Sequence, residues 1–252
     1  MKEMKATQYV DIVGRNSVAD CLRSDKKVSY IYVTPASKRD DKVAQTLKLA
    51  QGKGVSIEVV NQDDLDKRFP DTPTQGIVAQ VDLGETPTLK QILANKRDPL
   101  ILLYNHLDYE QNLGAILRTA WASKVDAVIA NNEGVHEITP VVAKVSMGAA
   151  ACVPVIGMSL YQAIDQIKDA AVWVTGVEVN MGKPYYQENL SGGQAFIFGG
   201  ESVGLTEPLV KRCDRLINIP MFSPIASLNV SVSTAIILFD RLRQDASQDH
   251  PR

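Results

Sequence analysis

Residues 217–235 read INIPMFSPIASLNVSVSTA, and the second half of this stretch follows two conflicting patterns. From Ser227 to Ser233, small polar residues alternate with Leu, Val and Val, a two-residue period that is typical of a half-buried strand. The chain then continues directly into IILFDRLRQ, which favours a helix. Which of the two structures the stretch adopts has to be decided from the rest of the chain.

Upstream of this stretch, from residue 99 onward, apolar runs alternate with amphipathic segments. LILLYN (100–105) is a continuous apolar run, as expected of a strand buried on both faces of a parallel sheet. NLGAILRTAWASK (112–124) has the spacing of an amphipathic helix. Further strands are predicted at VDAVIA, CVPVIG, AVWVTGVE, AFIFGG and RLINIP, and helices at ITPVVAKVSMGAA, LYQAIDQIKDA and TEPLVKRC. This alternation predicts an α/β fold with a parallel sheet between helices.

The first 85 residues carry a smaller α/β pattern of their own. Strands are predicted over 28–34, 55–60 and 76–82, and helices at GRNSVADCLRSD, DDKVAQTLKLAQGKG and NQDDLDKRF, the first of them capped by Asn16 or Ser17. The composition then changes at LGETPTLKQILANKRDP (83–99), which holds two prolines before the apolar pattern restarts. We therefore expect domains at residues 1–83 and 99–252, joined by a linker over 84–98 that contains a short helix.

Composition restricts the function classes. The 252 residues include 27 Lys and Arg against 29 Asp and Glu, which argues against attachment to nucleic acid by bulk charge but leaves a local basic patch open. The three cysteines are far apart and form no CxxC pair, so neither a zinc site nor a disulfide framework is expected. We find no signal segment and no apolar run long enough to cross a membrane, and we expect a soluble cytoplasmic protein.

The common nucleotide and hydrolase motifs are absent. GVEVNMGKP (176–184) places five residues between its glycines and Pro after its Lys, whereas a phosphate-binding P-loop needs four residues and then Ser or Thr. The sequence contains no GxGxxG after a strand, no HExxH and no GxSxG.

Three polar clusters instead follow predicted strands, at NHLDYEQNLGAILRTA (105–120), FGGESVGL (198–205) and residues 217–235. Ligands of open α/β sheets bind outside the carboxyl ends of the strands, so the three clusters predict one composite site. Taken singly, each has an ordinary structural explanation: Asn112 as a helix cap, Arg118 as a solvated side chain, the glycines as turns. Together, in this order and at these strand ends, they favour a functional site.

The three clusters resemble the motifs of the SpoU (TrmH-like) branch of the SPOUT RNA methyltransferases. The matching residues are Asn112, Gly114 and Arg118 in the first cluster, Gly199, Glu201 and Gly204 in the second, and Ile219, Pro220, Met221 and SLNVSV in the third. In the first domain, VGRNSVADCL (13–22) and TQGIVAQV (74–81) resemble the L30e-like substrate-binding domain of members that methylate large-subunit ribosomal RNA.

The resemblance implies an S-adenosylmethionine-dependent enzyme that methylates a ribose 2′-hydroxyl, in 23S-type ribosomal RNA above all. It implies a deep trefoil knot near the C-terminus and a homodimer with the active site completed across the interface. From the spacing of the cysteines and histidines, no metal is expected. SLNVSVSTA would then be the knotted loop and the opening turn of the last helix rather than a strand.

The resemblance also assigns residues to roles. It places the cofactor on Gly199, Gly200, Ile219, Met221 and Leu228, and the reacting centre on Asn112, Arg118, Glu201, Ser227 and Asn229. By this resemblance, Arg118 matches the arginine that is catalytic in the family. A guanidinium stays protonated, however, and is therefore a poor general base. Our hypothesis is that Arg118 binds an RNA phosphate and helps to polarise the 2′-hydroxyl, held by Glu201 or Asn229. Arg15 and Asn16 are candidate RNA contacts in the first domain.

Several positions depart from the family pattern and leave the target nucleotide open: Tyr109 and Glu110 stand where relatives often have Asp-Pro, and Gly200, Ser223, Ser233 and Thr74 also differ. Three other functions stay open at this point. They are a tRNA 2′-O-methyltransferase, a catalytically silent RNA-binding protein of the same fold, and a small-molecule α/β enzyme with another cofactor.

Overall fold

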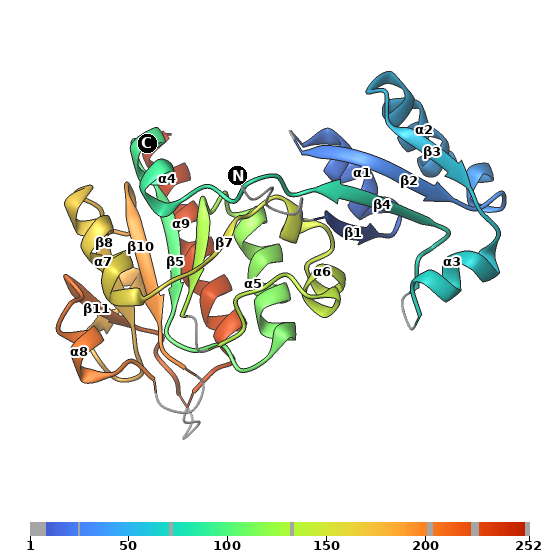
Figure 1. Cartoon of the computed structure of the whole chain (residues 1–252). Helices are drawn as coiled ribbons and strands as arrows, with labels where there is room; N and C mark the ends of the chain where they lie inside the picture. The colour runs from blue at the N-terminus through green and yellow to red at the C-terminus, as the bar shows by residue number, and fades with distance from the viewer. Residues whose placement is uncertain are drawn as a thin grey trace, which may run out of the picture. The chain divides into compact units, whose positions relative to one another are not determined.

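The structure is a computed structural model that describes residues 9–24, 26–70, 73–131, 134–200, 204–222 and 227–249 (Figure 1). Contacts group the chain into two compact units, one of residues 1–86 and 138–152, the other of residues 87–137 and 153–252. The segment 138–152 therefore packs with the first unit, although it lies far along the chain. The expected sequence domains at 1–83 and 99–252 stay a prediction.

The first unit is built on a four-stranded mixed sheet in the order β1-β4-β2-β3. The strands are β1 (Tyr9–Val13), β2 (Lys27–Val33), β3 (Ser56–Val59) and β4 (Ile77–Asp82). β4 runs antiparallel to both β1 and β2, whereas β2 and β3 are parallel. β1 was missed from the sequence, although YVDIV alternates between buried and more exposed residues as a strand should.

Helices of the first unit cover this sheet and close its core. They are α1 (Arg15–Arg23), the 3₁₀ helix η1 (Ser37–Arg39), α2 (Asp41–Gly52), α3 (Gln62–Arg68), α6 (Pro140–Ser146) and the 3₁₀ helix η2 (Ala149–Ala151). Asp40 and Asn61 cap α2 and α3 by accepting backbone N–H groups. The prediction that Asn16 or Ser17 caps the first helix is wrong, because α1 begins at Arg15 after Gly14 and no side chain caps it.

The second unit contains a seven-stranded sheet in the order β7-β6-β5-β10-β8-β11-β9, with every neighbouring pair parallel. The strands are β5 (Leu100–Tyr104), β6 (Ala127–Ala130), β7 (Val155–Gly157), β8 (Trp173–Val177), β9 (Lys183–Pro184), β10 (Gln194–Phe198) and β11 (Arg215–Asn218). The predicted parallel α/β fold is confirmed. The two-residue strand β9 had no recognisable sequence signal.

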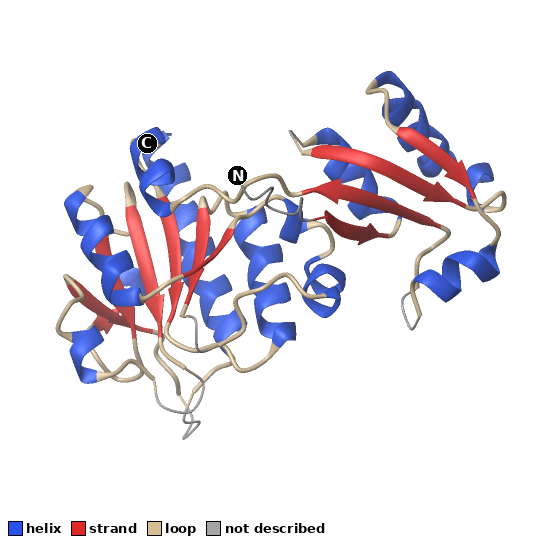
Figure 2. Cartoon of the chain, viewed as in Figure 1, coloured by secondary structure: helices blue, strands red, loops and turns tan. Residues whose placement is uncertain are grey.

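Helices lie on both faces of this sheet (Figure 2). They are α4 (Leu89–Asn95), α5 (Glu110–Ala122), α7 (Leu160–Asp169), the 3₁₀ helix η3 (Tyr185–Gln187), α8 (Glu207–Val210) and α9 (Val230–Asp249). Apolar side chains of α4, α7 and α8 share one core cluster with alternate residues of β5, β6, β8 and β10. The sheet is thus buried on both sides, which explains the continuous apolar runs of β5 and β10.

Within residues 217–235, Ile217 and Asn218 end β11, whereas SLNVSVSTA leads into α9 and does not form a strand. Residues 227–229 are irregular, α9 begins at Val230, and its buried residues Val230, Thr234, Ile237 and Leu238 recur at the helical period. The trefoil knot stays a prediction, since residues 201–203 and 223–226 of the two relevant loops lie outside the described residues.

Candidate active site

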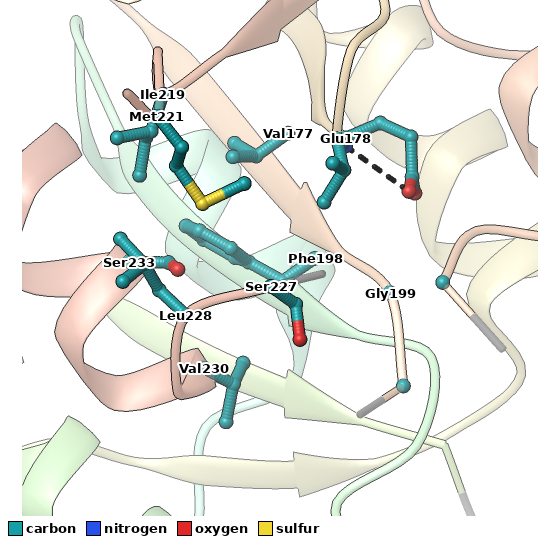
Figure 3. Close-up of a pocket in the computed structure, with 13 residues that line it drawn as sticks. Val177, Glu178, Phe198, Gly199, Ile219, Met221, Ser227, Leu228, Val230 and Ser233 are labelled. Atoms are coloured by element: carbon teal, nitrogen blue, oxygen red, sulfur yellow. Dashed lines mark hydrogen bonds between the residues drawn. The ribbon is translucent and has the colours of Figure 1, made fainter. Parts of the chain in front are cut away.

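A cavity of about 310 Å³ lies at the carboxyl ends of β8, β10 and β11, three strands that are neighbours in the sheet (Figure 3). All five residues predicted to bind the cofactor line it, together with Ser227 from the predicted reacting centre. The lining consists of Val177, Glu178, Val179, Phe198, Gly199, Gly200, Gly204, Ile219, Met221, Ser227, Leu228, Val230 and Ser233. Its volume and mixed apolar and backbone lining suit a small organic ligand.

The loop after β10 turns back tightly against itself. Gly200 and Gly204 exchange two backbone hydrogen bonds of 3.2 and 2.9 Å across the turn. A Cβ atom on Gly199 would lie 2.2 Å from the carbonyl carbon of Gly204, so this approach requires glycine. Glu201, predicted for the reacting centre, lies outside the described residues.

A stacked pair of aromatic rings connects the cavity to the sheet and to α9. The rings of Phe198 and Tyr104 lie 5.4 Å apart at an angle of 14°. The Tyr104 hydroxyl is 2.8 Å from Oγ1 of Thr234, which in turn donates to the Val230 carbonyl at 2.8 Å. Burial raises the pKa of Tyr104, so this hydroxyl stays protonated and serves structure rather than proton transfer.

Two predicted residues of the reacting centre contact each other directly. Nδ2 of Asn229 donates to Oδ1 of Asn112 at 3.0 Å, which joins the third motif to the first turn of α5. The other side of the Asn229 amide is occupied by the helix, since its Oδ1 accepts the backbone N–H of Ser231 at 2.9 Å. Asn229 therefore caps α9 and faces Asn112 at the same time.

Arg118 lies six residues beyond Asn112 on α5 with an exposed side chain. Among the described residues, its guanidinium makes no hydrogen bond or ion pair. The two described side-chain partners of Asn229 are Asn112 and Ser231, so support of Arg118 by Asn229 is not seen here. An exposed guanidinium is available to an incoming anion such as a phosphate.

Sequence reasoning missed the contribution of β8. Val177, Glu178 and Val179 stand at the end of this strand and line the cavity (Figure 3). They lie in GVEVNMGKP, which we rejected as a phosphate loop on its glycine spacing. The signal that exposed the other loops, polar residues directly after a buried strand, was present here as well.

Arg15 and Asn16 belong to the first unit and line a hollow of their own, with Asp40, Asp41, Lys42 and Gln75. The Arg15 guanidinium forms an ion pair with Asp40, and its backbone N–H donates to Oε1 of Gln75 at 3.1 Å. The backbone N–H of Val43 and the Arg15 guanidinium hold the pKa of Asp40 below its usual value. An anionic ligand at Arg15 would have to compete with this carboxylate.

The sequence matches two families along its length. Residues 99–239 match the SpoU rRNA Methylase family, and residues 12–87 match the RNA 2′-O ribose methyltransferase substrate-binding family. The chain belongs to the SpoU family.

Named members of the SpoU family align with nearly the whole chain. The 23S rRNA (guanosine-2′-O-)-methyltransferase RlmB of Haemophilus influenzae is 35% identical over 240 residues, which cover 92% of this chain and 97% of that protein. The Escherichia coli protein of the same name is 31% identical over 238 residues, which cover 92% of this chain and 98% of that protein.

Solved structures share the fold. An AdoMet-bound rRNA methyltransferase from Sinorhizobium meliloti has a TM-score of 0.76 at 21% identity, covering 93% of this chain and 87% of that one. The SpoU methyltransferase AviRb from Streptomyces viridochromogenes, in complex with AdoMet, has a TM-score of 0.77 at 18% identity. The match covers 95% of this chain and 91% of that one.

The described residues contain no group of three or more His, Cys, Asp or Glu side chains placed to hold a metal ion. Their helices are too short or too polar to cross a membrane.

Proposed function

We propose that this protein transfers a methyl group from S-adenosylmethionine to a ribose 2′-hydroxyl of large-subunit ribosomal RNA, at a guanosine. One observation carries the proposal. Two of the three SpoU motifs line one cavity, and the first motif meets the third through the hydrogen bond between Asn112 and Asn229. The chain also aligns over 92% of its length with a protein named as a 23S rRNA guanosine 2′-O-methyltransferase.

The cavity residues fit the cofactor. Ile219, Met221 and Leu228 supply apolar walls suited to an adenine ring, and the close backbone approach at Gly199 leaves amide and carbonyl groups without a covering side chain. S-adenosylmethionine supplies an activated methyl group on a sulfonium, whose positive charge is lost as the methyl leaves. The work of these residues is to bind the cofactor and hold it beside the hydroxyl that accepts the methyl.

The polar residues of the three motifs would handle the RNA. Arg118 is exposed and, within the described part of the chain, uncommitted, so it can bind a phosphate bidentately and lower the energy of charge that develops on the 2′-oxygen. The hydrogen bond between Asn112 and Asn229 fixes the first turn of α5 against the start of α9. Glu201 and Ser227 complete the proposed reacting centre, with Glu201 assigned by the family motif alone.

We further propose that the first unit contacts the RNA through Arg15 and Asn16, which line its polar hollow. The near-neutral net charge predicts moderate affinity that falls as salt concentration rises.

A homodimer is the assembly that we propose. α9 carries two large exposed apolar side chains one heptad apart, Val232 and Phe239, and Tyr109 is exposed at the start of α5, which packs against α9. Exposed apolar side chains that recur along one helix are typical of a protein interface. Phe239→Glu should shift the sedimentation coefficient toward a monomer, whereas Tyr161→Glu on α7 should leave it unchanged. A wild-type monomer at micromolar concentration would contradict the proposal.

The test of activity is methyl transfer from radiolabelled S-adenosylmethionine to purified 23S rRNA, 16S rRNA and total tRNA. We expect label in 23S rRNA, loss of transfer on Arg118→Ala, and little change on Lys90→Ala, a matched exposed cation on α4. RNA binding without transfer to any substrate would favour a silent RNA-binding protein. Label in tRNA alone would favour the tRNA enzyme.

A further inference from the structure

Glu178 is the single ionisable side chain among the described residues that line the cavity. The other polar groups of the described lining are the Ser227 and Ser233 hydroxyls and the backbone of the glycine loop. A carboxylate whose described neighbours in the cavity lining are all uncharged costs free energy to bury unless hydrogen-bond donors meet it. Such donors can come from the protein backbone or from a bound ligand.

The carboxylate is held rigidly at the end of β8. Its backbone N–H donates to the Ile217 carbonyl at 3.0 Å, which continues the pairing of β8 with β11. Oε2 accepts the backbone N–H of Leu205 at 2.8 Å, and Oε1 accepts that of Val179 at 3.2 Å. A Cβ on Gly204 would lie 2.8 Å from Oε1, so the loop closes directly over the carboxylate.

The carboxylate keeps free capacity to accept hydrogen bonds. An ionised carboxylate offers about four lone-pair sites, and two are occupied by the backbone donors. Within the described part of the chain, no Lys, Arg or His forms an ion pair with Glu178. A ligand that enters the cavity therefore meets an oriented acceptor.

We infer that Glu178 accepts hydrogen bonds from the ribose hydroxyls of the adenosine in S-adenosylmethionine, and so determines specificity for a ribonucleoside cofactor. The inference rests on the proposed function. The adenine ring suits the apolar wall of Ile219, Met221 and Leu228, and the ribose diol is the donor pair adjacent to that ring. An acidic residue outside the carboxyl end of a parallel strand that binds a ribose hydroxyl is an established solution in α/β folds.

The test is isothermal titration calorimetry with S-adenosylhomocysteine and with its analogue that lacks both ribose hydroxyls, and S-adenosylmethionine is titrated alongside them. Glu178→Ala should weaken binding of S-adenosylhomocysteine about ten-fold to a hundred-fold, the range for a hydrogen bond to a charged group. The same variant should bind the dideoxy analogue as the wild type does. Glu178→Gln keeps the volume and one acceptor and should lose less, and Glu207→Gln, an exposed carboxylate on α8, serves as the control.

Two outcomes would overturn the inference. Equal losses for both ligands would make Glu178 a support of the loop only, and a larger loss for S-adenosylmethionine than for S-adenosylhomocysteine would assign it to the sulfonium charge. If the wild-type protein binds neither ligand, the proposed function fails as well. If it binds both and the variants lose equally, only the role of Glu178 fails.

Discussion

Asn229 allows stability and catalysis to be separated at one position. Its Oδ1 caps α9 by accepting from Ser231, while its Nδ2 donates to Asn112. Asn229→Ala removes both contacts. Asn229→Asp keeps an oxygen for the cap but has no donor for Asn112.

The two contacts have different expected magnitudes. Loss of an Asn cap costs about 1 kcal/mol, and Asp caps a helix about as well as Asn. The Asn229–Asn112 bond contributes about 0.5–1.5 kcal/mol. Asn229→Ala should therefore lower the free energy of unfolding by about 2 kcal/mol. For a chain of this size, that loss corresponds to a melting temperature lower by about 4–8 °C. Asn229→Asp should lose only about half of that free energy.

Single-turnover methyl transfer on saturating 23S rRNA measures the functional part. Both variants should be slowed about ten-fold or more, since each removes the hydrogen bond that Asn229 donates to Asn112. A tenfold change corresponds to about 1.4 kcal/mol in the barrier. Asn61→Ala is the matched control, because it removes the cap of α3 but leaves the cavity intact. Wild-type transfer by Asn229→Asp would refute the reasoning, as would a slowed Asn61→Ala.

Three other predictions test the fold and its charged groups. Asp40→Asn keeps the cap of α2 but removes the ion pair with Arg15. RNA affinity in a filter-binding assay should therefore rise a few-fold, and it should depend more steeply on salt concentration. Unchanged affinity would show that Arg15 does not bind RNA. Thr234→Val removes the hydrogen-bond partner of the buried Tyr104 hydroxyl. It should lower the free energy of unfolding in urea by about 1–3 kcal/mol, more than Tyr104→Phe does. The reverse order would contradict this bonding pattern. The neighbouring Cys21 thiol lowers the pKa of Cys152, whereas burial raises the pKa of Cys213 to about 11. Iodoacetamide should therefore alkylate Cys152 before Cys213, and equal rates would contradict the two pKa shifts.

The parallel sheet of the second unit was predictable because its strands are buried on both faces. Runs such as LILLY and QAFIF have no alternative that buries them, and helices separate them along the chain. The cavity lining at Gly199, Ile219 and Leu228 was also anticipated, but through the family motifs rather than through periodicity. Assignment of these residues to the cofactor stays a proposal.

Other features needed the tertiary structure. Alternation in SLNVSVSTA suggests a strand, but Val230 and Thr234 are buried at helical spacing, and Asn229 turns the chain into the helix. Glu178 follows a buried strand, as the other site loops do, but its contact with Leu205 joins residues 27 apart in the chain. The sequence pattern does not predict that contact. The packing of segment 138–152 with the first unit is likewise a non-local property.

The most direct test of the central claim is to map the modification on 23S rRNA. A 2′-O-methyl group blocks attack of that oxygen on the neighbouring phosphate, so the methylated position resists alkaline cleavage. Unmodified 23S rRNA incubated with the protein and S-adenosylmethionine should gain protection at one guanosine, and Arg118→Ala should abolish it. Absence of any protected position, or a methyl group on a base instead of a ribose, would contradict the account.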